Sequence, residues 1–211
     1  MPSRRTLARR LESVADFADP DVSLEQYLTP PEIAAHVCHL AVMQGDLERP
    51  VLDLGTGTGM LAIGAALAGA PRVAGIDVDA AALAVARENA GAVLENRSPD
   101  WVCGDATRPP IQPTGEFTVL SNPPFGAQRG NEGADRAFLE ATTGLATVSY
   151  TIHNEGSQEF VESFSADHGG VVTHAFRAEF PIERRFEFHT DDSRTLAAEV
   201  FRIEWSGDRT A

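Results

Sequence analysis

Lysine is absent from this sequence of 211 residues, and all 17 basic residues are arginine. Asp and Glu together number 31, so the formal net charge is −14 at pH 7. A chain this acidic is not expected to hold nucleic acid by a broad basic surface, because that attraction comes from Lys and Arg neutralising phosphates. The basic residues are unevenly placed, however. The first ten residues contain Arg4, Arg5, Arg9 and Arg10 and no acidic residue.

Acidic excess with Arg kept and Lys absent is the composition expected in a cytoplasm at molar salt. There the Debye length is about 3 Å and the repulsion between like charges is screened. We therefore predict a halophilic source and a protein that unfolds as salt is lowered. Molar salt also weakens phosphate contacts, so any RNA recognition should depend on a specific pocket and a few arginines. Besides the N-terminal arginines, these are Arg177, Arg184 and Arg185, around Pro181.

Cysteine and long apolar runs are also scarce. Cys38 and Cys103 form no CxxC pair, which excludes a disulfide framework and a zinc finger and favours a reducing compartment. The longest nearly apolar run, Met60 to Ala70, is too short to span a bilayer, and the Arg-rich start lacks the apolar stretch of a signal peptide. His36 and His39 lack further paired ligands at zinc spacing. We expect a cytoplasmic protein with no metal site and no membrane contact.

Two segments before residue 50 carry helical signals. Residues 6–15 place apolar side chains at helical spacing. The second helix is expected to start at Thr29-Pro30-Pro31-Glu32 and to run to about Met43, with Thr29 as N-cap and Glu32 completing a capping box.

From Pro50 onward, short β-branched runs alternate with Ala-rich helical runs, which is typical of a parallel sheet with crossover helices. The predicted strands are 51–54, 72–76, 101–103, 117–120 and 147–152, and the predicted helices are 60–67, 80–90, 135–145 and 158–165. Two extended segments follow, 171–180 and 195–205, with no helix between them, so they should pair as an antiparallel hairpin. The sequence thus predicts an α/β fold with a mostly parallel sheet that ends in a hairpin.

A glycine loop, Asp53-Leu54-Gly55-Thr56-Gly57-Thr58-Gly59, follows the first strand and opens a helix. Glycines in this context let the backbone approach a ligand closely. Met60 stands where a dinucleotide fingerprint needs a third small residue, so a nicotinamide or flavin cofactor is disfavoured. Asp77 ends the second strand, where a carboxylate can accept both ribose hydroxyls, and Gly104-Asp105-Ala106 ends the third. A nucleoside without a pyrophosphate, such as S-adenosylmethionine, suits this set.

The fourth strand ends in Ser121-Asn122-Pro123-Pro124-Phe125-Gly126, and Asn122, Pro123, Pro124 and Phe125 are the candidate catalytic residues. Neither proline can donate a hydrogen bond, so this backbone is stiff and presents carbonyls. The Asn122 side-chain oxygen and the Pro123 carbonyl can accept both protons of one planar NH₂ group. Its nitrogen lone pair then becomes available to attack a methyl group. Phe125 offers a stacking face, worth about 1–3 kcal/mol for a base that is unpaired or flipped out.

Four segments together resemble one family. They are Leu24-Glu25-Gln26-Tyr27-x-Thr29, Asn122-Pro123-Pro124-Phe125-Gly126, Asp135-x-x-Phe138-Leu139 and Tyr150-x-Ile152-His153. In this order they resemble the methyltransferase-like protein five family of ribosomal RNA adenine-N6 methyltransferases, from about Leu7 to Trp205. The resemblance implies a Rossmann-like class I methyltransferase with seven strands and helices on both faces. With the composition, it suggests a halophilic archaeal member.

The resemblance also implies S-adenosylmethionine as methyl donor and one adenosine of small-subunit ribosomal RNA as target. Residues 1–45 would form a helical cap that contributes to the cofactor site, and 46–211 the methyltransferase domain, as one structural unit. The implied cofactor-binding residues are Gln26, Tyr27, Thr29, Asp53, Gly55, Gly57, Thr58, Asp77, Asp105, Ala106 and Asn122. The family works with a small zinc-binding methyltransferase activator protein, which implies a heterodimer. Gln128-Arg129 departs from the family pattern, in a loop usually richer in Lys.

Other functions share parts of this pattern. A protein glutamine-N5 methyltransferase acts on the same planar NH₂ group, but that class usually has Tyr where Phe125 stands and lacks the Glu-Gln-Tyr segment. A DNA adenine methyltransferase would need a base-reading domain for which no segment is large enough. A non-catalytic nucleoside-binding assembly module remains a third alternative. His153, expected just beyond the fifth strand, is either part of a substrate loop or a solvated loop histidine.

Overall fold

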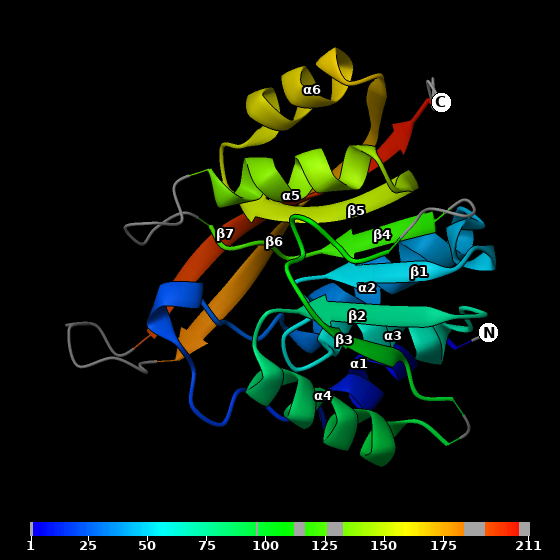
Figure 1. Cartoon of the computed structure of the whole chain (residues 1–211), viewed down its shortest axis with the longest axis vertical. Coiled ribbons are helices and arrows are strands. Elements are labelled where there is room, and N and C mark those ends of the chain that lie inside the picture. The colour runs from blue at the N-terminus through cyan, green and yellow to red at the C-terminus, as the bar shows by residue number, and fades with distance from the viewer. Residues whose placement is uncertain (1, 96, 112–116, 126–132, 184–192, 207–211) are drawn as a thin grey trace.

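The computed structural model describes residues 2–95, 97–111, 117–125, 133–183 and 193–206, and within these residues seven strands form one sheet (Figure 1). The strands are β1 Val51–Leu54, β2 Val73–Asp77, β3 Asp100–Cys103, β4 Phe117–Ser121, β5 Ala146–Asn154, β6 Gly170–Glu183 and β7 Ser193–Trp205. Their order across the sheet is β3-β2-β1-β4-β5-β7-β6. The first five pair in parallel, whereas β7 runs antiparallel to both β5 and β6. The predicted mostly parallel sheet with an antiparallel C-terminal hairpin is confirmed.

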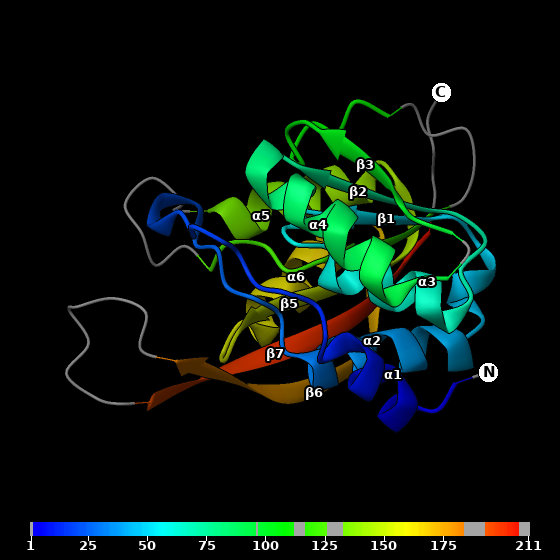
Figure 2. The same cartoon turned by 90° about the horizontal axis from the view of Figure 1, so that it is seen from below.

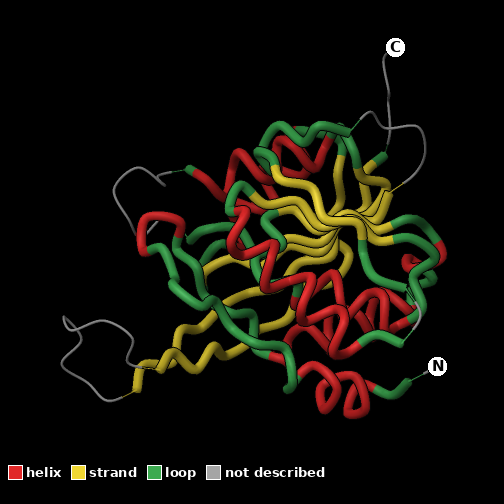
Figure 3. The backbone as a smooth tube through the Cα atoms, turned by 60° about the horizontal axis from the view of Figure 1, so that its bottom comes forward, coloured by secondary structure: helices red, strands yellow, loops and turns green. Residues whose placement is uncertain are grey.

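Helices cover both faces of the twisted sheet (Figure 3). They are α1 Arg4–Leu11, α2 Pro31–Met43, α3 Met60–Ala68, α4 Ala80–Val93, α5 Ala134–Thr143 and α6 Gln158–Asp167, with short 3₁₀ turns η1 Val22–Leu24 and η2 Asp46–Glu48. One apolar core joins α1 to α4 to the sheet, and a second joins α5 and α6 to its other face. This is a Rossmann-like α/β architecture, as the sequence predicts. No helix in the described part of the chain is long and apolar enough to cross a membrane.

The N-terminal segments differ in detail from the prediction. The α1 helix ends at Leu11 rather than near residue 15, and the backbone of Ala15 instead exchanges two hydrogen bonds with the Asn89 side chain of α4. The predicted capping box at Thr29 is wrong. Pro30 is the N-cap of α2, and its carbonyl accepts hydrogen bonds from the backbone of Ile33. The Thr29 hydroxyl is used elsewhere, because it accepts a hydrogen bond from Asn122.

A buried polar cluster connects η2 to the middle of the sheet. The Arg202 guanidinium of β7 donates to both carboxylate oxygens of Asp46, at 2.8 and 3.1 Å. The Tyr150 hydroxyl of β5 donates to the same carboxylate at 2.6 Å, and the Thr118 hydroxyl of β4 donates to the Asp46 carbonyl at 2.6 Å. Burial opposes the charge of Arg202, but its bonds to Asp46 and Glu204 raise its pKa above the ordinary value. The guanidinium therefore stays charged.

Candidate functional site

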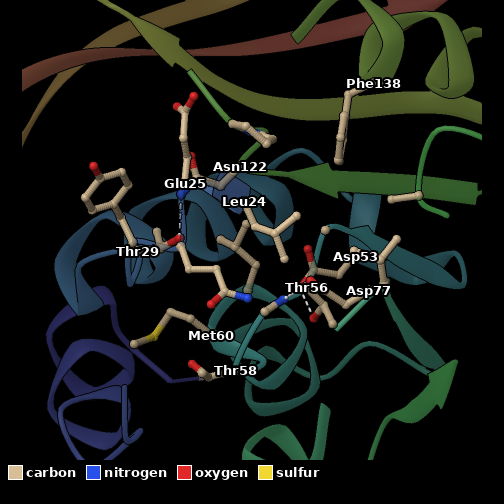
Figure 4. Close-up of a pocket in the computed structure, with 18 of the residues that line it drawn as sticks. Leu24, Glu25, Thr29, Asp53, Thr56, Thr58, Met60, Asp77, Asn122 and Phe138 are labelled. Atoms are coloured by element: carbon tan, nitrogen blue, oxygen red, sulfur yellow. Dashed lines mark hydrogen bonds between the residues drawn. The ribbon is translucent and has the colours of Figure 1, made fainter. Parts of the chain in front are cut away.

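A cavity of about 320 Å³ opens where the carboxyl ends of β1 to β4 meet the segment before α2 (Figure 4). Parallel strands end at a common edge, which is where open α/β sheets bind ligands. Most of the candidate site residues line this cavity: Gln26, Tyr27, Thr29, Asp53, Gly55, Gly57, Thr58, Asp77, Asp105, Ala106, Asn122 and Pro124. Pro123 and Phe125 do not line it. Phe125 is partly buried and packs against the core on the α1–α4 face of the sheet.

The glycine loop depends on two rings that the sequence analysis did not single out as site residues. Gly55 and Gly57 have φ values of 70° and 53°, a region that side chains rarely adopt. A Cβ atom at Gly57 would lie 2.7 Å from the Phe17 ring, and one at Gly55 would lie 3.0 Å from the Phe138 ring. The loop is thus tightly packed, and any residue other than glycine at these two positions would strain its backbone. Its amide at Gly57 donates to Oδ2 of Asp77 at 2.7 Å, which joins the ends of β1 and β2.

Asp53 is a buried carboxylate, and one of its two oxygens has no hydrogen-bond partner among the described residues. Its Oδ2 accepts hydrogen bonds from the Thr56 hydroxyl at 2.6 Å and the Ala62 amide at 2.9 Å. Its Oδ1 is buried without a hydrogen-bond partner among the described residues. Burial raises the pKa of Asp53 to about 7, against the lowering effect of the two bonds. An N–H donor or a cation in the cavity would relieve this unpaired acceptor.

The carboxylates of Asp77 and Asp105 have different surroundings. Burial raises the pKa of Asp77, although amides of Asp79 and Gly57 donate to it. The hydroxyl and amide of Thr107 lower the pKa of Asp105, which is exposed at the end of β3. The two acids therefore line the cavity at different depths, and both present oxygen acceptors.

The Asn122 amide is held by one side-chain hydrogen bond. Its Nδ2 donates to the Thr29 hydroxyl at 3.0 Å, while its Oδ1 is buried without a partner in the described part of the chain. Figure 4 shows Asn122 and Thr29 together in the pocket, with Asp53 and Asp77 farther along it. The turn that follows is held from β5, because Asn154 donates to the Phe125 carbonyl at 3.2 Å. The arrangement offers an oriented acceptor at the carboxyl end of β4.

His153 is neither a solvated loop residue nor part of a substrate loop. It lies inside β5 with 1% of its surface exposed, and burial lowers its pKa to about 4. Its Nε2 is 2.9 Å from the Thr151 hydroxyl, which in turn accepts a hydrogen bond from Ser121 at 3.2 Å. Since Ser121 precedes Asn122, this chain of contacts supports the end of β4 from within the core.

Further cavity residues had no assigned role: Phe17, Leu24, Glu25, Leu28, Thr56, Met60, Leu61, Val78, Thr107, Ala134 and Phe138. Glu25 belongs to the Glu-Gln-Tyr segment and was quoted only as part of a pattern. It is 7% exposed and has a left-handed backbone with φ of 50°. Such a conformation in a non-glycine residue often marks a functional site. Gln128-Arg129, Arg184 and Arg185 lie outside the described residues.

The fold and this cavity define an S-adenosylmethionine-dependent class I methyltransferase. The family model of ribosomal protein L11 methyltransferase (PrmA) matches residues 38–98, the part with the glycine loop. The chain is 32% identical to the rRNA N(6)-adenosine-methyltransferase Mettl5 of Drosophila melanogaster, over 95% of each chain. It is also 36% identical to an uncharacterized protein of Methanocaldococcus jannaschii, over 100% of this chain and 98% of the other.

A solved structure agrees with these relatives. The crystal structure of a "putative RNA methyltransferase" from Pyrococcus horikoshii superposes with a TM-score of 0.86 at 35% identity, covering 98% of this chain and all of the other. The chain belongs to the Mettl5 family of rRNA N(6)-adenosine-methyltransferases. The family resemblance seen in the sequence is therefore confirmed.

Proposed function

We propose that this protein methylates N6 of one adenosine in small-subunit ribosomal RNA, with Asn122 and Pro123 holding the target amine. The observation that carries the proposal is the buried Asn122 Oδ1, which is an oriented acceptor with no partner among the described residues. An adenine amino group has two protons, and the Pro123 carbonyl is the second acceptor we assign to it. Family membership supports adenosine in ribosomal RNA as the substrate.

The cavity fits S-adenosylmethionine by the chemistry of its open acceptors. Asp53 Oδ1 and the Thr58 hydroxyl are buried without partners in the described chain, and both suit the amino-acid part of that cofactor. Asp77 suits the ribose hydroxyls, and Asp105 with Ala106 suits the adenine. Gly55 and Gly57 let the backbone approach the ligand. When bound, S-adenosylmethionine supplies an electrophilic methyl group on its sulfonium.

The Glu-Gln-Tyr segment is the proposed cover of this site. Gln26 donates to Asp79 at 2.8 Å and accepts from the Asp21 amide at 2.7 Å, so the segment bridges to the loop after β2. Burial raises the pKa of Tyr27, next to it in the cavity wall. These contacts support the assignment of residues 1–45 as a cap on the cofactor site.

Positioning is the main catalytic contribution in this proposal. Asn122 and Pro123 orient the amine, and the cavity wall excludes water from the reacting atoms. The nitrogen becomes acidic only after transfer and can lose its proton to water, so no general base is required. We assign His153 no proton transfer, because it is buried within β5 and bonded to Thr151.

The test is transfer of a labelled methyl group to ribosomal RNA, followed by digestion to nucleosides. Label in N6-methyladenosine is expected, and Asn122→Ala should lower kcat about 10²–10³-fold with cofactor binding kept. Gln158→Ala, an exposed amide on α6, is the matched control and should have no effect. Label found in protein would favour the glutamine-N5 reaction. Unchanged cellular function of Asn122→Ala would favour a non-catalytic binding module.

A heterodimer with a small zinc-binding methyltransferase activator protein is a separate proposal that rests on the family resemblance. Within the described chain, β3 and β6 are the two edge strands of the sheet and are open to pairing with a partner strand. Gel filtration and methyl transfer with and without the activator test this. Full stability and activity of the isolated chain would contradict the proposal.

A further inference from the structure

A second hollow lies outside the cofactor cavity, between α1, α2 and β6. Its volume is about 580 Å³. Figure 2 shows α1 and α2 beside β6 at this place. Four arginines line it, Arg4, Arg5 and Arg9 from α1 and Arg177 from β6. We call it the arginine groove.

The arginine groove has the opposite charge to the chain as a whole. Its four arginines face three glutamates, Glu12, Glu32 and Glu179, whereas the whole chain has a net charge of −14. The fourth arginine of α1, Arg10, does not line the groove. Its guanidinium instead donates to the Val93 carbonyl at 2.7 Å. Arg4, Arg5 and Arg9 are exposed. Arg177 also lies 3.6 Å from Glu155 and 3.8 Å from Glu199, so the charge offered to a polyanion comes from the three arginines of α1.

An aromatic pair forms part of the wall of the arginine groove. The His36 ring of α2 stacks on the Phe176 ring of β6, with centroids 4.1 Å apart and planes at 24°. Burial and the neighbouring charge of Arg4 lower the pKa of His36, so its ring is neutral at pH 7. A flat, uncharged surface between arginines is the combination that binds single-stranded nucleic acid, because bases meet the rings while phosphates meet the charges.

The arginine groove is continuous in sequence and space with the catalytic turn. Thr29, which holds Asn122, comes directly before the start of α2. Glu32 and Ile33 in the first turn of α2 already line the groove, and His36 follows one turn later. At 1.5 Å per helical residue, His36 lies about 8 Å along the helix axis from Pro31, the first residue of α2. An RNA strand that leaves the target pocket along α2 therefore reaches the groove within the first two turns of this helix.

We propose that the arginine groove holds the single-stranded RNA next to the target adenosine. Arg4, Arg5 and Arg9 contact its phosphates, and the His36–Phe176 pair offers an apolar surface to its bases. This inference rests on the proposed function, since a target base must be unpaired or flipped out and its neighbours must lie on adjacent protein surface. It assigns recognition of the surrounding RNA to α1, away from the acceptors that hold the amine.

The test compares two triple variants with the same change in net charge. Arg4→Gln with Arg5→Gln and Arg9→Gln removes the α1 charges, and Arg72→Gln with Arg87→Gln and Arg97→Gln removes three exposed arginines elsewhere. Binding is measured with a long RNA that contains the adenosine labelled by the wild-type protein. The groove variant should bind at least about tenfold more weakly, and its slope of log K against log[KCl] should fall by about 2, at about 0.7 per phosphate contact on single strands. The control should lose less than about twofold.

RNA length separates this groove from the methylation site. With a short oligonucleotide that holds only the adenosine and its nearest neighbours, the groove variant should match the wild type in kcat/KM. With the long RNA its KM should rise and its kcat should stay the same. The triple Arg→Lys variant should recover most of the binding and shows that the chain still folds.

Three results would overturn the inference while leaving the proposed function intact. They are equal losses in the groove and control variants, equal losses with short and long RNA, and loss of binding to the zinc-binding activator with RNA binding kept. Failure of the wild-type protein to label adenine in any RNA would instead remove the proposed function, and with it the premise of the groove.

Discussion

Asp46 and Asp53 lie on either side of the start of β1, and both are buried, with exposed fractions of 2% and 1%. Asp46 has both carboxylate oxygens bonded, to a guanidinium and a phenol. Asp53 has one oxygen bonded and one without a partner among the described residues. The two buried aspartates thus differ, because Asp46 has hydrogen-bond partners on both carboxylate oxygens and Asp53 has partners on only one.

The difference separates two buried carboxylates by what they suit: Asp46, before β1, suits stability, and Asp53, within β1, suits ligand binding. A buried carboxylate with a complete set of partners fixes one packing arrangement, here that of η2 against β4, β5 and β7. A buried carboxylate with an open oxygen destabilises the free protein and is relieved by a ligand that donates to it. The unpaired buried oxygen of Asp53 therefore lies at the carboxyl ends of the strands, where the cavity is.

Asp46→Asn should give the largest effect on stability. The amide turns an N–H group toward Arg202 and leaves the buried guanidinium with only the half-exposed Glu204 as counter-charge, which costs about 3–5 kcal/mol. Denaturant unfolding at pH 7 measures the loss. Asp19→Asn, at an exposed position, is the control and should leave the unfolding midpoint unchanged. A loss below about 1 kcal/mol at position 46 would contradict the assigned role of the cluster.

His153→Gln tests a buried base that has no close acidic partner, since its Nδ1 lies 3.9 Å from Asp135. Its pKa is lowered from 6.5 to about 4, so the unfolded chain takes up the proton first as the pH falls. Wild-type stability should therefore drop by about 3 kcal/mol relative to the variant between pH 6.5 and pH 4. Unfolding free energies of both proteins across that range measure the difference. A constant difference would contradict the neutral, buried state of His153.

Above pH 7, Asp53→Asn should raise the free energy of unfolding, whereas Asp46→Asn should lower it. The raised pKa means that the folded state keeps a proton that the unfolded state releases between pH 3.8 and pH 7. The carboxylate therefore costs the fold about 4 kcal/mol above pH 7. The variant avoids this cost but adds an unpaired N–H group worth about 1–3 kcal/mol, for a net gain of about 2 kcal/mol above pH 7 and a net loss below pH 4.

The same variant should bind S-adenosylmethionine more weakly, because an acceptor is replaced by a donor. Calorimetric titration with the cofactor measures this, and Asp19→Asn again serves as the control. Greater stability at pH 8 together with weaker cofactor binding would establish the contrast between the two aspartates. Equal affinity in variant and wild type would remove Asp53 from the cofactor site.

The site residues at the carboxyl ends of the parallel strands could be predicted from the sequence. Asp53, Asp77 and Asn122 each lie at or next to the carboxyl end of a strand, and parallel strands bring these ends to one edge. Phe17 and Phe138 could not be predicted, because their contacts with Gly57 and Gly55 join segments far apart in the chain. An apolar side chain gives no local sign of which glycine it will cover.

Three other differences have the same physical origin, a tertiary contact that overrides a local pattern. Thr29 has the sequence of an N-cap but its hydroxyl bonds to Asn122, while the Pro30 carbonyl starts the helix. Asp46 and Arg202 are 156 positions apart, and nothing local pairs them. His153 was placed beyond β5, yet pairing with β7 extends that strand through Asn154.

Arg177→Gln should give the smallest effect and shows what burial adds to an ion pair. Arg177 is 76% exposed and lies 3.6 Å from Glu155 and 3.8 Å from Glu199, without the double hydrogen bond that Arg202 makes to Asp46. At the lowest KCl concentration at which the protein remains folded, the loss in unfolding free energy should stay below about 1 kcal/mol. Molar KCl should abolish it, because salt screens exposed charges far more than buried ones, whereas the loss in Asp46→Asn should persist. Equal salt dependence of the two variants would mean that the Asp46 cluster is open to solvent.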